Sequence, residues 1–157
     1  MDYSKYVDEI VLQEKELVFE HFSNDDAFEL GMIIYNMAKE RKLPVTIEIT
    51  RNTQMIFHVA LPETSPDNDE WLRRKRNLVT RTGMSSFRIV AELCRDNAVF
   101  ENRFELTRDN YAPAGGCFPI NVEGTGIVGT VAVSGLEMSL DHALVVEGIK
   151  KYLGIDA

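Results

Sequence analysis

Two stretches near the start of the chain carry apolar residues at helical spacing. Over residues 4–21 the apolar positions recur every three or four residues, and glutamates occupy the intervening positions. This pattern predicts one amphipathic helix. The run Ser23-Asn24-Asp25-Asp26 interrupts it and suits a helix N-terminus, because such side chains cap free backbone N–H groups. A second helix is therefore predicted up to about Lys39.

The pattern then changes to the two-residue period of a strand. Apolar and polar residues alternate over residues 45–50, which predicts a strand with one buried face. Arg51-Asn52 makes a tight turn, and residues 54–60 return as an antiparallel partner. Residues 62–69 contain two prolines and several acids, and we interpret them as a loop.

Further helices are predicted over residues 70–82, 87–95 and 140–152. Gly83 ends the first of these, and Ser85 or Ser86 can cap the second. In the last helix Leu140, Ala143 and Leu144 are among the residues expected to be buried, with Ser139 or Asp141 as the cap. Residues 97–113 carry no clear period, and a short strand or an ordered loop both fit them.

A glycine-rich hairpin precedes the last helix. Residues 117–122 and 127–133 are rich in β-branched side chains and flank the turn Glu123-Gly124-Thr125-Gly126. Two hairpins, with helices before, between and after them, predict an α+β fold in which helices pack on an antiparallel sheet. The length of 157 residues favours a single domain over residues 1–157.

Composition narrows the classes of function. The chain carries 17 basic and 25 acidic residues, a net charge of −8, which argues against a general nucleic-acid binder because such proteins present a basic field. No apolar run approaches the ~20 residues that span a bilayer, and the first residues lack the apolar core of a secretion signal. Cys94 and Cys117 fit reduced thiols of a cytoplasmic protein better than a disulfide framework.

One basic cluster stands out in this acidic chain. Arg73-Arg74-Lys75-Arg76, with Arg81 and Arg88, can seat a carboxylate, a phosphate or another planar anion, because arginine binds these in a bidentate manner. A solvated helix face, or an ion-paired surface in an oligomer, explains the same run. Lys75 differs from its neighbours, because its spacing from Trp71 and Leu78 places it on the apolar face. It is either a pocket cation or a side chain that reaches outward to water.

Other residues of interest cluster in the glycine-rich region. Gly115-Gly116 allows close approach of backbone N–H groups to a ligand, although a simple turn explains it equally. Ser134 stands at a strand end beside Gly135, and Asp141 follows where a helix begins. His142 is a candidate general base, but a lone exposed histidine is the commoner case. The three histidines show no metal-ligand spacing, so no metal site is predicted.

The motifs Ala114-Gly115-Gly116-x-x-Pro119-Ile120 and Gly129-x-x-x-Val133-Ser134-Gly135, followed by Asp141, resemble the signature of the haem-degrading-like (GlcG/HbpS-like) family. Trp71-x-x-x-Lys75 and Ser85-Ser86 resemble its UPF0303 branch. This resemblance covers nearly the whole chain and implies a profilin-like arrangement of α-β-α layers, a symmetric homo-oligomer, and haem as a candidate ligand.

The residues and the resemblance together leave three functions open. The first is binding of a small ligand, which would be haem or another small anionic, planar molecule. The second is a non-catalytic, homo-oligomeric interaction module, and the third is an enzyme on a small anionic metabolite that uses Lys75, Ser134, Asp141 and His142. The candidate ligand-binding residues are Trp71, Lys75, Gly115, Gly116, Pro119, Ser134, Gly135, Asp141 and His142.

Overall fold

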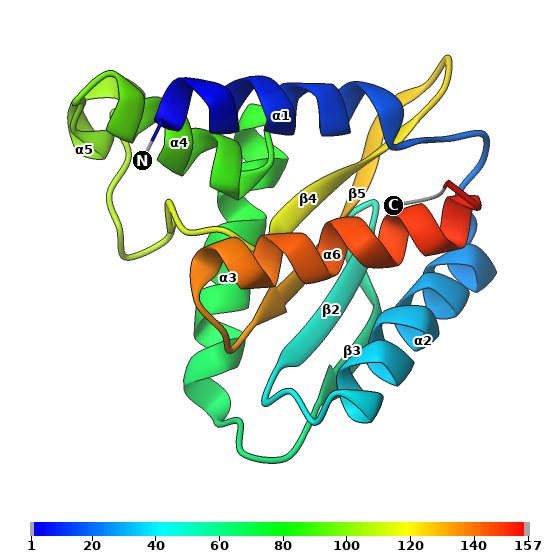
Figure 1. The fold of residues 1–157 in the computed structure, drawn as a ribbon. Coiled ribbons are helices and arrows are strands. Elements are labelled where there is room, and N and C mark those ends of the chain that lie inside the picture. Colours follow the sequence, from blue (N-terminus) through cyan, green and yellow to red (C-terminus); the bar gives the residue numbers. More distant parts are fainter. Residues whose placement is uncertain (1, 156–157) are drawn as a thin grey trace.

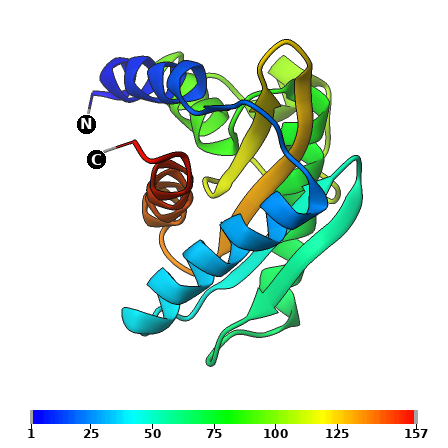
Figure 2. The ribbon, with the colours of Figure 1, turned by 90° about the vertical axis from the view of Figure 1, so that its right-hand side faces the viewer.

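A five-stranded sheet with helices on both faces organises the chain (Figures 1 and 2). The structure is a computed structural model that describes residues 2–155, so residues 1, 156 and 157 of the predicted domain lie outside it. The strand order is β1-β4-β5-β2-β3. Helices α2 (Asn24–Glu40) and α6 (Met138–Leu153) cover one face, and α3 (Pro66–Thr82) covers the other. The α+β prediction is confirmed, with helical layers on both sides of the sheet.

Alternation along the central strands explains the two covered faces. In β2 (Thr46–Arg51), Ile47 and Ile49 join the large apolar core beneath α2 and α6. Glu48, on the opposite face, lies under α3 and is 2% exposed. A period of two predicted one buried face here, but both faces are buried because each faces a helix.

The predicted hairpins are both present. β2 pairs antiparallel with β3 (Gln54–Ala60), and β4 (Cys117–Val122) pairs antiparallel with β5 (Gly126–Ser134). β2 also pairs antiparallel with β5, which joins the two hairpins into one sheet. The candidate residues of the glycine-rich region therefore stand at the end of the central strand β5, beside the start of β4.

The prediction of one helix over residues 4–21 is wrong at its C-terminal end. Helix α1 (Tyr3–Glu16) stops at Glu16, and Val18–Phe19 forms the short strand β1. This strand pairs in parallel with β4, so the sheet is mixed rather than purely antiparallel. Leu17 and Phe19 are almost fully buried, because here the chain crosses from the helix to the sheet edge.

Two further segments differ from the prediction. Helix α3 begins at Pro66, inside the stretch predicted as a loop, because Ser65 and Asn68 form a capping box and proline suits a first helical position. Residues 97–113 were predicted to form a short strand or an ordered loop. They contain the short helix α5 (Phe100–Phe104), which follows α4 (Ser86–Arg95). Within the described residues, none of the helices has the length and apolarity needed to cross a membrane.

Candidate functional site

A cavity of about 300 Å³ lies where the N-terminal half of α3 meets the end of β5 and the start of α6. Six of the nine predicted site residues line it, and we call it the Lys75 cavity. Its lining consists of Asp67, Asn68, Trp71, Lys75, Ala114, Gly115, Ser134, Gly135, Leu136, Met138 and Asp141. The topology brings them together because α3 crosses the sheet above β4 and β5, and the chain turns directly from β5 into α6.

Lys75 is the central group of this cavity. It is 2% exposed, as its place on the apolar face of the helix predicted. Its ammonium group donates to the carbonyl oxygens of Val133, at 2.6 Å, and Gly115, at 3.0 Å. These two bonds use two of the three N–H donors of the ammonium group. The nearest charged group to the remaining donor is the Asp141 carboxylate, whose Oδ2 lies 3.8 Å from Nζ.

The glycine pair is required by this arrangement. Gly116 has a φ of +126°, and a Cβ at this position would lie 2.5 Å from Lys75 Nζ and 2.4 Å from the Val133 carbonyl oxygen. A Cβ on Gly115 would lie 2.4 Å from the carbonyl oxygen of Met138. Glycine at both positions therefore lets the backbone close around the ammonium group. Gly116 does not line the cavity, but it forms the wall behind Lys75.

Asp141 faces Lys75 from the first turn of α6. It is 3% exposed and accepts backbone hydrogen bonds from Leu136 N, at 3.0 Å, and Gly135 N, at 3.4 Å. The expected N-cap role is wrong, since Glu137 occupies the N-cap position. Asp141 instead holds the turn between β5 and α6 closed.

Burial shapes the protonation of this pair. Desolvation lowers the pKa of Lys75, while the Asp141 carboxylate opposes the shift. Desolvation also raises the pKa of Asp141 to about 6, against the opposing effects of Lys75 and the backbone N–H groups. A perturbed acid and a perturbed base that face one cavity are typical of functional sites.

Pro119 and His142 lie away from the Lys75 cavity. Pro119 is inside β4, opposite Thr130 of β5. His142 lines a separate cavity between α1 and α6, where its Nε2 is 2.8 Å from Gln13 Oε1. The four groups of the enzyme hypothesis therefore do not share one cavity, because three of them line the Lys75 cavity and His142 does not.

The expectation of an exposed histidine on the last helix is wrong. His142 is 5% exposed and packs against the rings of Phe87 and Phe118, and burial lowers its pKa to about 4. Leu140, which was expected to be buried, is 53% exposed. The apolar contacts of His142 come from α4 and β4, which the local pattern of the last helix does not contain.

Most of the basic cluster is ion-paired within the chain. Arg73 binds Glu70, Arg88 binds Glu14 and Glu92, and Arg76 binds the buried Glu48. Arg74 lies over the ring of Trp71, with its Cζ 4.3 Å from the ring centroid. The sequence predicted ion pairs for this run only between the subunits of an oligomer, whereas the partners here are on the same chain.

Five lining residues were missed by the sequence analysis: Asp67, Asn68, Ala114, Leu136 and Met138. The sequence did contain a signal for the first two. Ser65-Pro66 followed by Asn68 is a helix start, so α3 could have been extended to bring Asp67 and Asn68 beside Trp71. Leu136 and Met138 follow Gly135 in the β5–α6 turn, and nothing local identifies them as cavity residues.

The chain is similar to known proteins both in sequence and in fold. The chain is 45% identical to a UPF0303 protein of Streptomyces coelicolor over 148 residues, which cover 94% of each chain. The crystal structure of Ybr137w protein superposes with a TM-score of 0.88 at 27% identity, over 96% of this chain and 90% of that one. A PduOC–haem complex matches with a TM-score of 0.67 at 15% identity, over 82% of this chain and 92% of that one, which shows a shared fold.

The family described as "Haem degrading protein HbpS-like" matches residues 22–150. That range contains every residue that lines the Lys75 cavity. The chain therefore belongs to the haem degrading protein HbpS-like family and, within it, is similar throughout to the UPF0303 proteins.

Proposed function

We propose that this chain binds a small organic acid in the Lys75 cavity. The observation that carries the proposal is the buried ammonium group of Lys75, which two carbonyl oxygens hold at the cavity wall. A buried lysine is costly unless its donors are satisfied, and one donor here has only a carboxylate at 3.8 Å. A ligand carboxylate at this point would complete the hydrogen bonding of Lys75.

The rest of the cavity suits a small ligand with a planar or apolar body. Trp71, Leu136 and Met138 supply apolar surface, whereas Ser134 and Asn68 supply polar groups. A volume of about 300 Å³ is at the lower end of the range for small-molecule sites. An aromatic or short aliphatic acid fits these limits.

Asp141 makes the proposed binding depend on pH. A ligand carboxylate beside Lys75 would also lie near Asp141, and two neighbouring carboxylates repel each other when both are ionised. Binding should therefore tighten as the pH falls through the Asp141 pKa of about 6, and a proton should be taken up with the ligand.

The residues that line the Lys75 cavity do not fit haem. Haem iron is held by histidine, cysteine, methionine or tyrosine side chains, and of these only Met138, at the cavity rim, lines the Lys75 cavity. In the cavity between α1 and α6, His142 Nε2 is 2.8 Å from Gln13 Oε1, and Nδ1 is buried without a hydrogen-bond partner among the described residues. Nε2 is therefore occupied and Nδ1 is closed off from the cavity, so we derive no haem chemistry from His142.

The test begins with native mass spectrometry of the protein purified from its cells, which reports any retained ligand. Calorimetric titration with benzoate, and with benzamide as the neutral counterpart of the same shape, then tests the charge requirement. We expect benzoate to bind more tightly than benzamide. The affinity for benzoate should fall in Ser134→Ala, and at pH 7 it should rise in Asp141→Asn. His142→Gln is the control, because His142 lies in another cavity. Equal binding of the two probes would contradict the proposal, and hemin titration by absorbance tests haem directly.

A homo-oligomer is a second proposal from the same region. At the start of α6, Met138, which lines the Lys75 cavity, is 39% exposed, and Leu140, which lines the cavity between α1 and α6, is 53% exposed. Exposed apolar side chains of this size favour burial against a second copy. The same native mass spectrum gives the number of subunits, and Leu140→Glu should lower it. A monomeric wild-type protein would contradict this proposal.

A further inference from the structure

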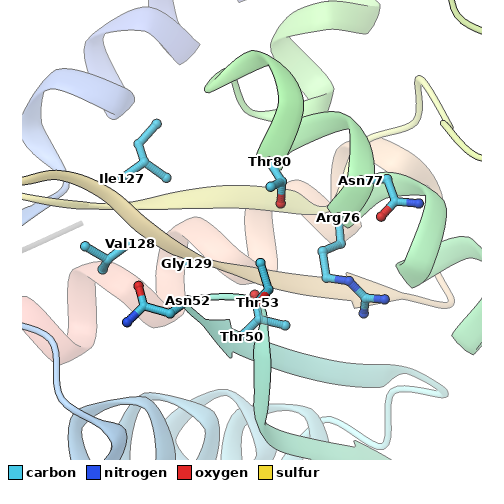
Figure 3. Close-up of a pocket in the computed structure, with 9 residues that line it drawn as sticks. All are labelled: Thr50, Asn52, Thr53, Arg76, Asn77, Thr80, Ile127, Val128 and Gly129. Carbon is cyan, nitrogen blue, oxygen red and sulfur yellow. The ribbon is translucent and has the colours of Figure 1, made fainter.

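A second cavity opens on the α3 face of the sheet, at the opposite end of the helix (Figure 3). It has a volume of about 440 Å³ and shares no lining residue with the Lys75 cavity. The turn between β2 and β3, the start of β5 and one side of α3 enclose it. We call it the Arg76 groove, since Arg76 is the charged residue among its lining side chains.

Arg76 is anchored in the groove by only one of its nitrogens. Its Nη1 donates to both carboxylate oxygens of Glu48, at 2.9 and 2.6 Å. Glu48 is 2% exposed, and burial raises its pKa while Arg76 opposes this shift. Among the described residues, no hydrogen-bond partner is found for Nε and Nη2 of Arg76. These two nitrogens form one planar edge of the guanidinium, which is the edge that carboxylates and phosphates bind.

The remaining walls are rich in neutral hydrogen-bonding groups. Thr80 of α3 and Thr53 and Asn52 of the β2–β3 turn are labelled around the groove in Figure 3. The hydroxyl of Thr50 already has a hydrogen-bond partner, the hydroxyl of Thr130 at 2.7 Å. Thr53 and Thr80 are exposed and can turn their hydroxyls toward a bound molecule.

The turn at the rim adopts an unusual conformation. Asn52 and Thr53 have φ angles of +51° and +66°, the values that a two-residue hairpin turn requires at both central positions. Glycine usually follows asparagine in such a turn, because a β-branched residue is strained at positive φ. Thr53 keeps a hydroxyl at the groove rim despite this strain. Strained residues of this kind are concentrated at functional sites.

From this arrangement we propose that the Arg76 groove is an oxyanion-binding site, for a phosphate or carboxylate group. The group docks on the Nε–Nη2 edge of Arg76 and receives further hydrogen bonds from Thr80 and from the Asn52-Thr53 turn. Glu48 neutralises part of the charge of Arg76 from the opposite side, so binding of a lone inorganic anion is weak. The groove extends beyond the anion to Ile127, whose side chain is 46% exposed. Its natural ligand is therefore a small phosphorylated or carboxylated molecule with an apolar part.

The test is an NMR titration with inorganic phosphate, with acetate as the carboxylate arm. It is followed at the Nε–H signal of Arg76 where that residue is present, and at the backbone amide signals of Asn52 and Thr53 in every variant. We expect a saturable shift of these signals, and a loss of affinity of at least about tenfold in Arg76→Lys, the difference that 1.4 kcal/mol represents. This variant keeps the positive charge beside Glu48 and loses the planar edge. Arg73→Lys, on the same helix but outside the groove, is the matched control and should bind as the wild type does.

Two variants keep the test decisive if Arg76→Lys does not fold. Thr80→Val removes one exposed hydroxyl and should weaken phosphate binding severalfold. Thr53→Gly relieves the positive φ, so it should stabilise the fold while weakening binding. A phosphate affinity that is unchanged in both variants would overturn the proposal, as would a wild-type signal that does not move. Asp141→Asn, in the other cavity, should leave phosphate binding intact, which separates this site from the proposed organic-acid site.

Discussion

Lys75 and Arg76 are neighbours in the sequence, but their environments are opposite. The ammonium group of Lys75 is buried and held by the carbonyl oxygens of Gly115 and Val133. The side chain of Arg76 is a quarter exposed, and one guanidinium nitrogen donates to Glu48. Because consecutive helix residues point about 100° apart, one faces the ends of β4 and β5 and the other faces β2. The comparison teaches that a run of basic residues need not form one binding surface.

The difference between the two cations predicts different costs of removal. A buried cation supports the groups around it, so its loss leaves them unpaired. A partly solvated cation at a groove contributes less to the fold, and Arg76 keeps two of its three nitrogens for a ligand. The variants below are ordered by the size of the effect that we expect.

The largest effect is expected for Lys75→Met. Methionine fills a similar volume but leaves Asp141 without its counter-ion and two carbonyl oxygens without their donor, so the free energy of unfolding should fall by about 3–5 kcal/mol. Urea unfolding followed by circular dichroism measures this. The double variant Lys75→Met/Asp141→Leu should recover part of the loss, because it removes the uncompensated charge. A single variant as stable as the wild type would show that Lys75 is not a structural cation.

The second effect is a change of stability with pH. It compares Asp141, in the Lys75 cavity, with His142, in the cavity between α1 and α6. The Asp141 pKa of about 6 is above its ordinary value, so this group stabilises the fold at low pH, and the contribution is lost as the pH rises from about 4 to 6. The His142 pKa of about 4 is below its ordinary value, so its contribution is present above about 6.5 and is lost as the pH falls to about 4.

These opposed contributions overlap between about pH 4 and 6, and single variants should separate them. In Asp141→Asn the free energy of unfolding should fall with decreasing pH by about 2–3 kcal/mol, owing to His142. In His142→Gln it should fall with increasing pH by a similar amount, owing to Asp141. Urea unfolding at several pH values measures both slopes. Slopes of the same sign in the two variants would contradict this assignment.

A smaller effect is expected for Arg76→Met. Glu48 would lose its partner, but Arg76 is partly solvated, so we expect a loss of about 1–3 kcal/mol in the free energy of unfolding. The double variant Arg76→Met/Glu48→Gln should regain most of it, because glutamine carries no charge to be left buried. Urea unfolding of the four proteins forms a double-mutant cycle. A loss equal to that of Lys75→Met would remove the distinction between the two cations.

The sequence could predict Lys75 but not the role of Arg76, and the reason is physical. Lys75 is placed by the period of its own helix, because Trp71 and Leu78 lie three or four residues away. The partner of Arg76 is Glu48, which belongs to a distant strand that was predicted to have only one buried, apolar face. Only the position of α3 over that face makes Glu48 a buried acid. The interaction is a consequence of tertiary packing, which a local pattern does not contain.

The same reasoning separates the parts of the fold that were predicted from those that were not. Both hairpins were correct, because their strand periods are local signals, although the first turn is Asn52-Thr53 and not Arg51-Asn52. Strand β1 was missed because its two residues become a strand only by pairing with β4. His142 was misjudged because its burial comes from Phe87 and Phe118, on other elements.

The smallest expected effect is a change in tryptophan fluorescence, which distinguishes the Lys75 cavity from the Arg76 groove. Trp71 is the only tryptophan of the chain, and it lines the Lys75 cavity but not the Arg76 groove. It is 38% exposed, so a bound molecule should change its contact with water and therefore its fluorescence. We expect benzoate to change the emission saturably, with the same dissociation constant as in calorimetry, and inorganic phosphate to leave it unchanged.

The variants decide whether this optical signal reports one cavity or both. Ser134→Ala should weaken the benzoate response, whereas Arg76→Lys should leave it intact, because no lining residue is shared. If phosphate also changed the emission, and Arg76→Lys abolished that change, the two sites would be coupled through α3, which carries Trp71, Lys75 and Arg76. Independence of the two titrations would instead establish that one helix, by turning two adjacent cations to different strands, serves two separate sites.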